Sequence, residues 1–186
     1  MIGFNKYSLR VFGGALIAAA VACDESVAAS GEVVDPNAPV SLVDPARWQP
    51  TDIASDPFKD RPADDTCPAF GYGVDAGLFG MYSGDCKYLT AAQGMLTDLQ
   101  PGDTVTIEVG HGQLLSLEPA EAHMAIAIPG QILWEKRIAI PGPPWFGVIE
   151  VPITAAYKAG DPILFHVHNH GPNSYRLVRI ERSARL

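Results

Sequence analysis

Short apolar segments that alternate with period two constrain the fold of this sequence more than any other feature. In Thr104–Val109, the side chains of Val105, Ile107 and Val109 share one face of an extended strand, while threonine and glutamate occupy the other face. Pro101-Gly102-Asp103 precedes this segment and is typical of a turn. The segment is therefore predicted to be a half-buried β-strand.

Further segments of strand length follow, most of them beside a glycine or proline turn signal: 122–128, Gln131–Ile140, Gly147–Ile153, Ile163–Asn169 and Tyr175–Glu181. Phe70–Tyr82 predicts a hairpin or irregular strand, and 88–98 a short helix or a further strand. No segment predicts a long helix. We therefore expect an all-β, antiparallel β-sandwich, and about eight strands favour a jelly-roll over an immunoglobulin-like topology.

The beginning of the chain has the pattern of an export signal. Lys6 and Arg10 precede an unbroken run of apolar and small residues, Val11–Ala22. The run is shorter than the ~20 residues that cross a bilayer. Residues 1–22 are therefore predicted to be a secretory signal peptide.

The run ends in Ala20-Val21-Ala22-Cys23, which resembles the lipobox of bacterial lipoprotein precursors, with Ala20 where leucine is usual. The resemblance implies that Cys23 becomes the lipidated first residue of an exported, membrane-anchored protein of the bacterial cell envelope. Ordinary cleavage after Ala22 is the alternative, since the same residues satisfy the A-x-A rule. The choice between inner and outer membrane stays open.

The chain contains three cysteines, and an exported protein with an odd number needs an explanation. Lipidation of Cys23 leaves Cys67 and Cys86 as an even pair. We expect these two to form a disulfide in an oxidising compartment.

Composition changes along the mature chain. Residues 24–65 contain ten acidic residues, three basic residues and six prolines, which is typical of an extended linker. We therefore expect an acidic, proline-rich tether over 23–65, in which Trp48 and Ile53 could dock, and a β-sandwich domain over 66–186. The net charge of −8 argues against nucleic-acid binding, which needs a basic surface.

The histidines carry the candidate chemistry. His166 and His168 lie on one face of a predicted strand, opposite Phe165 and Val167, so their rings could converge on one zinc, copper or nickel ion. The candidates for a third ligand are His170, His123 and His111, with Glu121 as a carboxylate ligand or supporting residue. The alternative is that these histidines are ordinary residues of a solvent-facing surface.

Trp145 and Phe146 follow Pro143-Pro144 and predict a loop tip that could stack on a ligand. Trp134 is predicted to belong to the core. The sequence has no HExxH motif and no G-x-S-x-G motif, so an enzyme is the less favoured interpretation.

Two functions follow. The first is a lipid-anchored, non-enzymatic β-sandwich binding module displayed at a bacterial membrane surface, with a glycan or an envelope protein as ligand. The second is a histidine-based metalloprotein that binds zinc or copper, with metal-dependent hydrolysis among its activities. The oligomeric state is not predicted.

Overall fold

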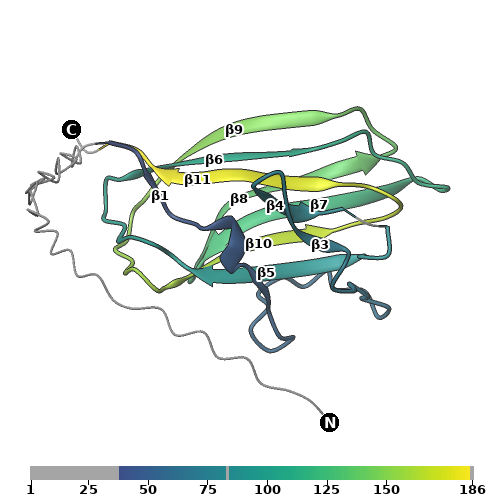
Figure 1. The fold of residues 1–186 in the computed structure, drawn as a ribbon, viewed down its shortest axis with the longest axis horizontal. Coiled ribbons are helices and arrows are strands. Elements are labelled where there is room, and N and C mark those ends of the chain that lie inside the picture. Colours follow the sequence, from purple (N-terminus) through teal and green to yellow (C-terminus); the bar gives the residue numbers. More distant parts are fainter. Residues whose placement is uncertain (1–37, 83, 185–186) are drawn as a thin grey trace, which may run out of the picture. The chain divides into compact units, whose positions relative to one another are not determined.

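A computed structural model describes residues 38–82 and 84–184, which form two antiparallel β-sheets packed face to face (Figure 1). The predicted signal peptide, Cys23 and residues 24–37 of the predicted tether lie outside the described residues. No helix in the described part of the chain has the length and apolarity needed to cross a membrane. The strands are β1 (Val40–Ser41), β2 (Gln49–Pro50), β3 (Tyr72–Asp75), β4 (Leu78–Met81), β5 (Tyr88–Gly94), β6 (Thr104–His111), β7 (Ala120–Ile128), β8 (Gln131–Ile140), β9 (Trp145–Pro152), β10 (Pro162–His168) and β11 (Tyr175–Arg182).

The strand order identifies the topology. One sheet has the order β3-β4-β11-β6-β9, with β1 also pairing with β11, and the other has the order β2-β5-β10-β7-β8. Among β4 to β11, successive strands alternate between the two sheets except at the β7–β8 hairpin. The resulting four-stranded sets, β4-β11-β6-β9 and β5-β10-β7-β8, have the order of a jelly-roll. The predicted antiparallel sandwich and its jelly-roll topology are confirmed.

The core lies between the two sheets and follows the predicted alternation. Val105, Ile107 and Val109 of β6 are fully buried, and so are Phe165 and Val167 of β10. Residues 88–94 form a strand, not a helix, and 72–81 form the predicted hairpin. Cys67 and Cys86 form the predicted disulfide.

The described part of the predicted tether belongs to the sandwich, so the predicted domain boundary at residue 66 is wrong. β1 pairs with β11 and β2 pairs with β5. Trp48 is buried and stacks on Phe79 with 5.4 Å between ring centroids, whereas Ile53 is 73% exposed. The composition misled the prediction because proline is tolerated on short edge strands, as at Pro50.

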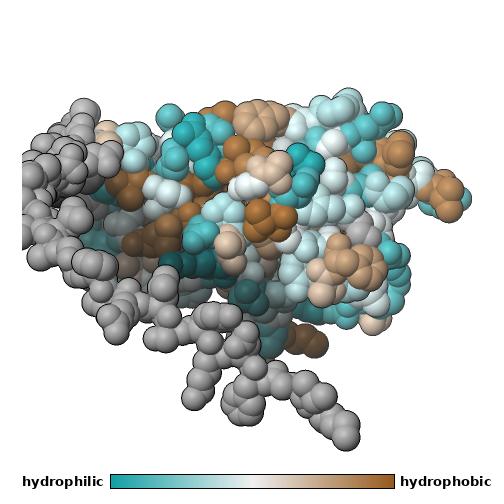
Figure 2. Space-filling model, viewed as in Figure 1, coloured by the Kyte–Doolittle hydropathy of each residue, from teal (hydrophilic) through white to brown (hydrophobic). Residues whose placement is uncertain are grey.

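The surface has no single large apolar region on the face seen in Figure 2, where hydrophilic and hydrophobic residues are interspersed. Exposed large apolar side chains occur in several separate segments of the chain. They include those of Ile53, Phe70, Leu117, Phe146 and Val148. The burial of polar groups is therefore more informative about function than the exposed apolar residues are.

Candidate metal centre

Three of the five histidines lie together on the outer face of the β5-β10-β7 region. His166 and His168 are two residues apart on β10 and share a face, as predicted. His123 of β7 pairs directly with His168 across the antiparallel ladder. The register therefore brings together side chains that are more than 40 residues apart in the sequence.

This outer face is covered by residues 51–66, which we call the covering segment. The ring of Phe58 stacks on His166, with 4.0 Å between centroids, and meets His123 edge-on at 5.7 Å. Phe58 also packs against Ala125, Ala127 and Leu164, and the small alanine side chains leave room for its ring. His166 is fully buried and His123 is 2% exposed, so the interpretation of His166 as a solvent-facing residue is wrong.

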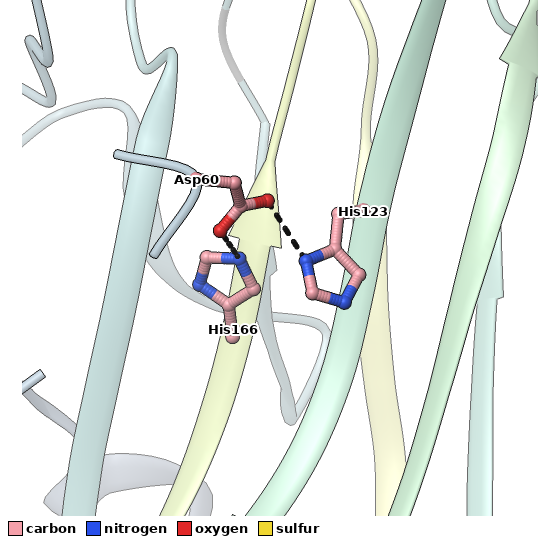
Figure 3. A group of neighbouring side chains, drawn as sticks. All are labelled: Asp60, His123 and His166. Carbon is pink, nitrogen blue, oxygen red and sulfur yellow. Dashed lines mark hydrogen bonds and ion pairs between the residues drawn. The ribbon is translucent and has the colours of Figure 1, made fainter. Parts of the chain in front are cut away.

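Asp60 of the covering segment places its carboxylate between the histidine rings, as Figure 3 shows. Oδ2 of Asp60 lies 2.8 Å from Nδ1 of His123 and 3.3 Å from Nδ1 of His168. Oδ1 lies 3.5 Å from Nε2 of His166. One ligand atom from each of Asp60, His123 and His166 lies within 4.8 Å of the others, and we call these three residues the Asp–His cluster.

A hydrogen-bonded chain on the far side of His166 determines which ring nitrogen carries a proton. The hydroxyl of Thr90 donates to Oδ2 of Asp56, so its oxygen accepts from Nδ1–H of His166 at 2.9 Å. In the neutral imidazole, Nε2 then presents a lone pair to Oδ1 of Asp60. Both atoms are buried, and neither has a hydrogen-bond partner. A cation between two such electron-rich atoms would remove this electrostatic conflict.

The acid–base properties of the cluster favour an ionised carboxylate beside neutral imidazole. Burial raises the pKa of Asp60, but when the facing nitrogens of His166 and His123 carry protons they lower it more, so in that form of the cluster the pKa lies well below its usual value. Burial lowers the pKa of His166 and of His168, and the nearby charge of Asp60 only partly opposes this effect. A carboxylate with neutral imidazoles is the form that metal ions bind.

Asp56 fastens the covering segment beside the cluster. Its Oδ2 accepts hydrogen bonds from Tyr88, Thr90 and Arg61, at 2.8, 3.0 and 2.9 Å. Burial raises the pKa of Asp56. These hydrogen bonds, together with one from the Phe58 backbone, lower it more, so the pKa of Asp56 lies below its usual value. An ionised Asp56 thus orients His166 through Thr90.

Charged residues of β8 form the rim of the cluster. Oε2 of Glu135 lies 3.1 Å from Nε2 of His123, and a carboxylate in this position orients the ring of many metal-bound histidines. Nη1 of Arg137 lies 3.7 Å from Oδ2 of Asp60 and 3.7 Å from Oε1 of Glu121. Glu121 therefore pairs with Arg137 at the rim and does not join the cluster as a ligand.

The remaining predicted site residues lie elsewhere or at the edge. His170 is exposed, with its ring centroid 4.7 Å from that of His168. His111 is far from the cluster in the fold, at the end of β6, where its ring stacks on Trp145 at 5.9 Å. Trp145 and Phe146 begin β9 and are not a loop tip: Trp145 is half-buried against Trp134, and Phe146 is 56% exposed.

Sequence reasoning missed Asp60, Asp56, Phe58 and Glu135. One signal was present: residues 122–128 contain no polar residue except His123, which is typical of a strand buried on both faces. Such a strand requires a covering element. The acidic, proline-rich composition of residues 24–65 indicates a linker and gives no sign that this segment contains the cover.

No family model matches the sequence, and no curated protein matches it. Solved structures do resemble the fold. A structure named CBM4 is 12% identical with a TM-score of 0.42, covering 79% of this chain and 94% of its own. The K3 cleaved adhesin domain of Lys-gingipain from Porphyromonas gingivalis w83 is 13% identical with a TM-score of 0.42, covering 77% and 98%. A family 16 carbohydrate-binding module is 11% identical with a TM-score of 0.36, covering 61% and 86%. Identities this low do not indicate what this chain binds.

Proposed function

We propose that this protein is a non-enzymatic, metal-binding β-sandwich module that holds one zinc ion through Asp60, His123 and His166. The observation that carries the proposal is the pair of buried, unpartnered atoms, Nε2 of His166 and Oδ1 of Asp60, 3.5 Å apart. Two ligands of one tetrahedral zinc ion are separated by about 3.4 Å when each bond is about 2.05 Å long. This pair of atoms therefore already has nearly the required spacing, and the ligand atoms of the whole cluster lie within 4.8 Å of one another.

The donor set selects the class of metal. Imidazole nitrogens suit zinc, copper, nickel and iron, whereas calcium and magnesium prefer oxygen ligands alone. Iron sites with two histidines and one carboxylate use open coordination positions for their chemistry, but Phe58 closes this cluster by stacking on His166. His168 lies 3.3 Å from Asp60 and is the candidate fourth ligand. A closed, four-coordinate site is typical of bound zinc that does not catalyse.

The proposed location is the bacterial cell envelope, where a lipid on Cys23 would hold the module at a membrane. The lipobox-like residues Ala20–Cys23 support this part of the proposal. We expect mass spectrometry of the exported protein to find a diacylglycerol-modified Cys23 at its N-terminus. Cys23→Ala should move the protein from the membrane fraction to the soluble fraction. An unmodified Cys23 in the wild-type protein would contradict the proposed lipid anchor and would leave the proposed zinc site untouched.

Metal content tests the proposed function directly. The full chain would be produced through an oxidising compartment without a polyhistidine tag, and its zinc, copper, nickel and iron measured by elemental analysis. We expect one zinc per chain, lost in His166→Ala and retained in His111→Ala, because His111 lies outside the cluster. A wild-type protein that holds no metal, and that takes up zinc no more tightly than His166→Ala does, would contradict the proposal.

A second candidate function is glycan binding on the other sheet. A groove of about 550 Å³ lies beside the exposed ring of Phe146, with Gly110, Arg176 and Val178 among its other lining residues. An aromatic ring beside an arginine and backbone polar groups suits a sugar ring, which has both an apolar face and hydroxyl groups. Titration of soluble envelope polysaccharides tests this function: binding that Phe146→Ala abolishes and Val148→Ala retains would support it.

A further inference from the structure

We propose that His170 and His168 form the entry route by which zinc reaches the Asp–His cluster. This inference rests on the proposed zinc-binding function and adds to it the path and the order of ligand exchange. Two ligands of the site, His166 and His123, are buried, so zinc needs a path to them from solvent. His170 and His168 supply donor groups that lead from an exposed ring to Asp60.

His168 contacts both the Asp–His cluster and the exposed His170. Its Nδ1 lies 3.3 Å from Oδ2 of Asp60, so it contacts the cluster directly. Its side chain is 14% exposed, whereas that of His166 is fully buried. Its ring centroid lies 4.7 Å from that of His170, which is exposed. His170, His168 and Asp60 therefore form a continuous series of ligands that leads from the exposed His170 ring to the Asp60 carboxylate, which is 17% exposed.

A surface cavity of about 330 Å³ contains the outer part of this series. His168 and His170 line it together with Asp64, whose carboxylate pairs with Lys87. The cavity offers two imidazole rings whose centroids lie 4.7 Å apart. It is the hollow through which a hydrated ion can approach His168.

The sides of the cluster differ in what lines them. The ring of Phe58 covers His166 and contacts the edge of His123. On the β8 side, Arg137 lies 3.7 Å from Oδ2 of Asp60, beside the carboxylates of Glu121 and Glu135. The side of His168 offers a second imidazole, His170, beside a surface cavity.

The transfer is a series of ligand exchanges without any change of oxidation state. Zinc, hydrated at first, binds His170 and His168 and loses water molecules to the solvent. Asp60 then replaces His170 as a ligand, and His123 and His166 replace the remaining water. Any ring nitrogen that carries a proton in the metal-free protein releases that proton to water as it binds the ion.

Rapid-mixing kinetics with zinc and a fluorescent zinc chelator would test the route in the full chain. A residue that acts only on the path changes the association and dissociation rates by the same factor and leaves Kd unchanged. For His170→Ala we expect both rates to fall about tenfold, the lower end of the rate gain that cavities lined by favourable groups provide. Leu117→Ala is the matched control, because Leu117 lines the same cavity, is fully exposed and cannot bind zinc.

The outcomes separate the two proposals. Unchanged rates in His170→Ala would overturn the route while the zinc site stands. A weaker Kd with an unchanged association rate would make His170 a ligand of the final site and would also overturn the route. Failure of the wild-type protein to bind zinc would instead overturn the proposed function. Equal slowing of both rates in His170→Ala, absent in Leu117→Ala, would support the route.

Discussion

The outer faces of the two sheets differ in what covers them. On β6 and β9 the outward positions carry Thr104, Thr106, Phe146 and Val148, and these side chains are exposed or half-buried. On β7 and β10 the outward positions carry Ala125, Leu164 and His166, and the covering segment buries them. The same strand-forming pattern thus produces an open surface on one sheet and a second, smaller core on the other.

The difference shows how a sandwich can bury polar chemistry without disturbing its main core. The histidines project away from Phe165 and Val167, so the central core contains apolar side chains from both sheets. The polar groups are enclosed between the sheet and the covering segment, where Asp56 and Asp60 supply partners for them. Most of the polar groups enclosed there are paired, and the exceptions are Oδ1 of Asp60 and Nε2 of His166, the two atoms assigned to zinc.

Removing the cover should have the largest effect on stability. Phe58→Ala is expected to reduce the free energy of unfolding by about 3 kcal/mol, because it empties the space over His166 and Ala125. The equivalent change on the open face, Phe146→Ala, should cost less than about 0.5 kcal/mol. Urea unfolding of both variants would measure this, and equal losses would mean that the covering segment contributes no second core.

Zinc should stabilise the protein through the face under the covering segment and not through the open face of β6 and β9. At a free concentration a hundredfold above Kd, an ion that binds only the folded state stabilises it by about 2.7 kcal/mol. Thermal unfolding of the wild-type protein should shift upward accordingly, and unfolding of His166→Ala should not. A shift of the same size in both proteins would place zinc somewhere other than the Asp–His cluster.

The carboxylate of Asp56 should contribute more to the free energy of unfolding than an exposed carboxylate does. Asp56→Asn is expected to cost about 2 kcal/mol near neutral pH, because three side chains lose an ionised acceptor. Asp75→Asn, which breaks the exposed pair with Arg176, should cost less than about 0.5 kcal/mol. Urea unfolding near pH 7 would measure both losses.

The pH dependence of this difference has a definite sign. The pKa of Asp56 is lowered in the fold, so its ionised form stabilises the protein above the pKa of the unfolded chain. That contribution is lost as pH falls below the ordinary aspartate pKa of 3.8 and through the lowered pKa of the folded state. The stability difference between wild type and Asp56→Asn should therefore shrink over this range, and a difference that grows would contradict the assignment.

Of these changes, Glu135→Gln should have the smallest effect in free energy, and it should act on zinc binding alone. Glu135→Gln is expected to weaken zinc binding about tenfold, because the amide orients the His123 ring less strongly than the carboxylate does. Its effect on the unfolding of the metal-free protein should be slight, since the Glu135 side chain is 52% exposed. Competition with a chelator would give the affinity, and an unchanged Kd would show that the Glu135 contact has no part in binding.

The main sandwich could be predicted because its core strands are local patterns: Val105, Ile107 and Val109 alternate with polar residues within one segment. His166 and His168 could likewise be placed on one face. Their covering could not be predicted, because it depends on contacts over large sequence separations, such as those of Asp60 with His123 and with His168. The composition of residues 24–65 suggested a linker, although two of its acidic residues are the partners that the histidines and tyrosine require.

The disulfide has a consequence for the order in which the site matures. The covering segment is held at one end by β2, which pairs with β5, and at the other by the Cys67–Cys86 bond directly after it. A chain that is still reduced lacks this bond, so the loop that carries Asp60 then runs from β2 to β3, and its greater length raises the entropic cost of closure. We therefore expect oxidation to precede metal loading, so that a newly made chain acquires its ion only after it reaches the compartment in which its cysteines can pair.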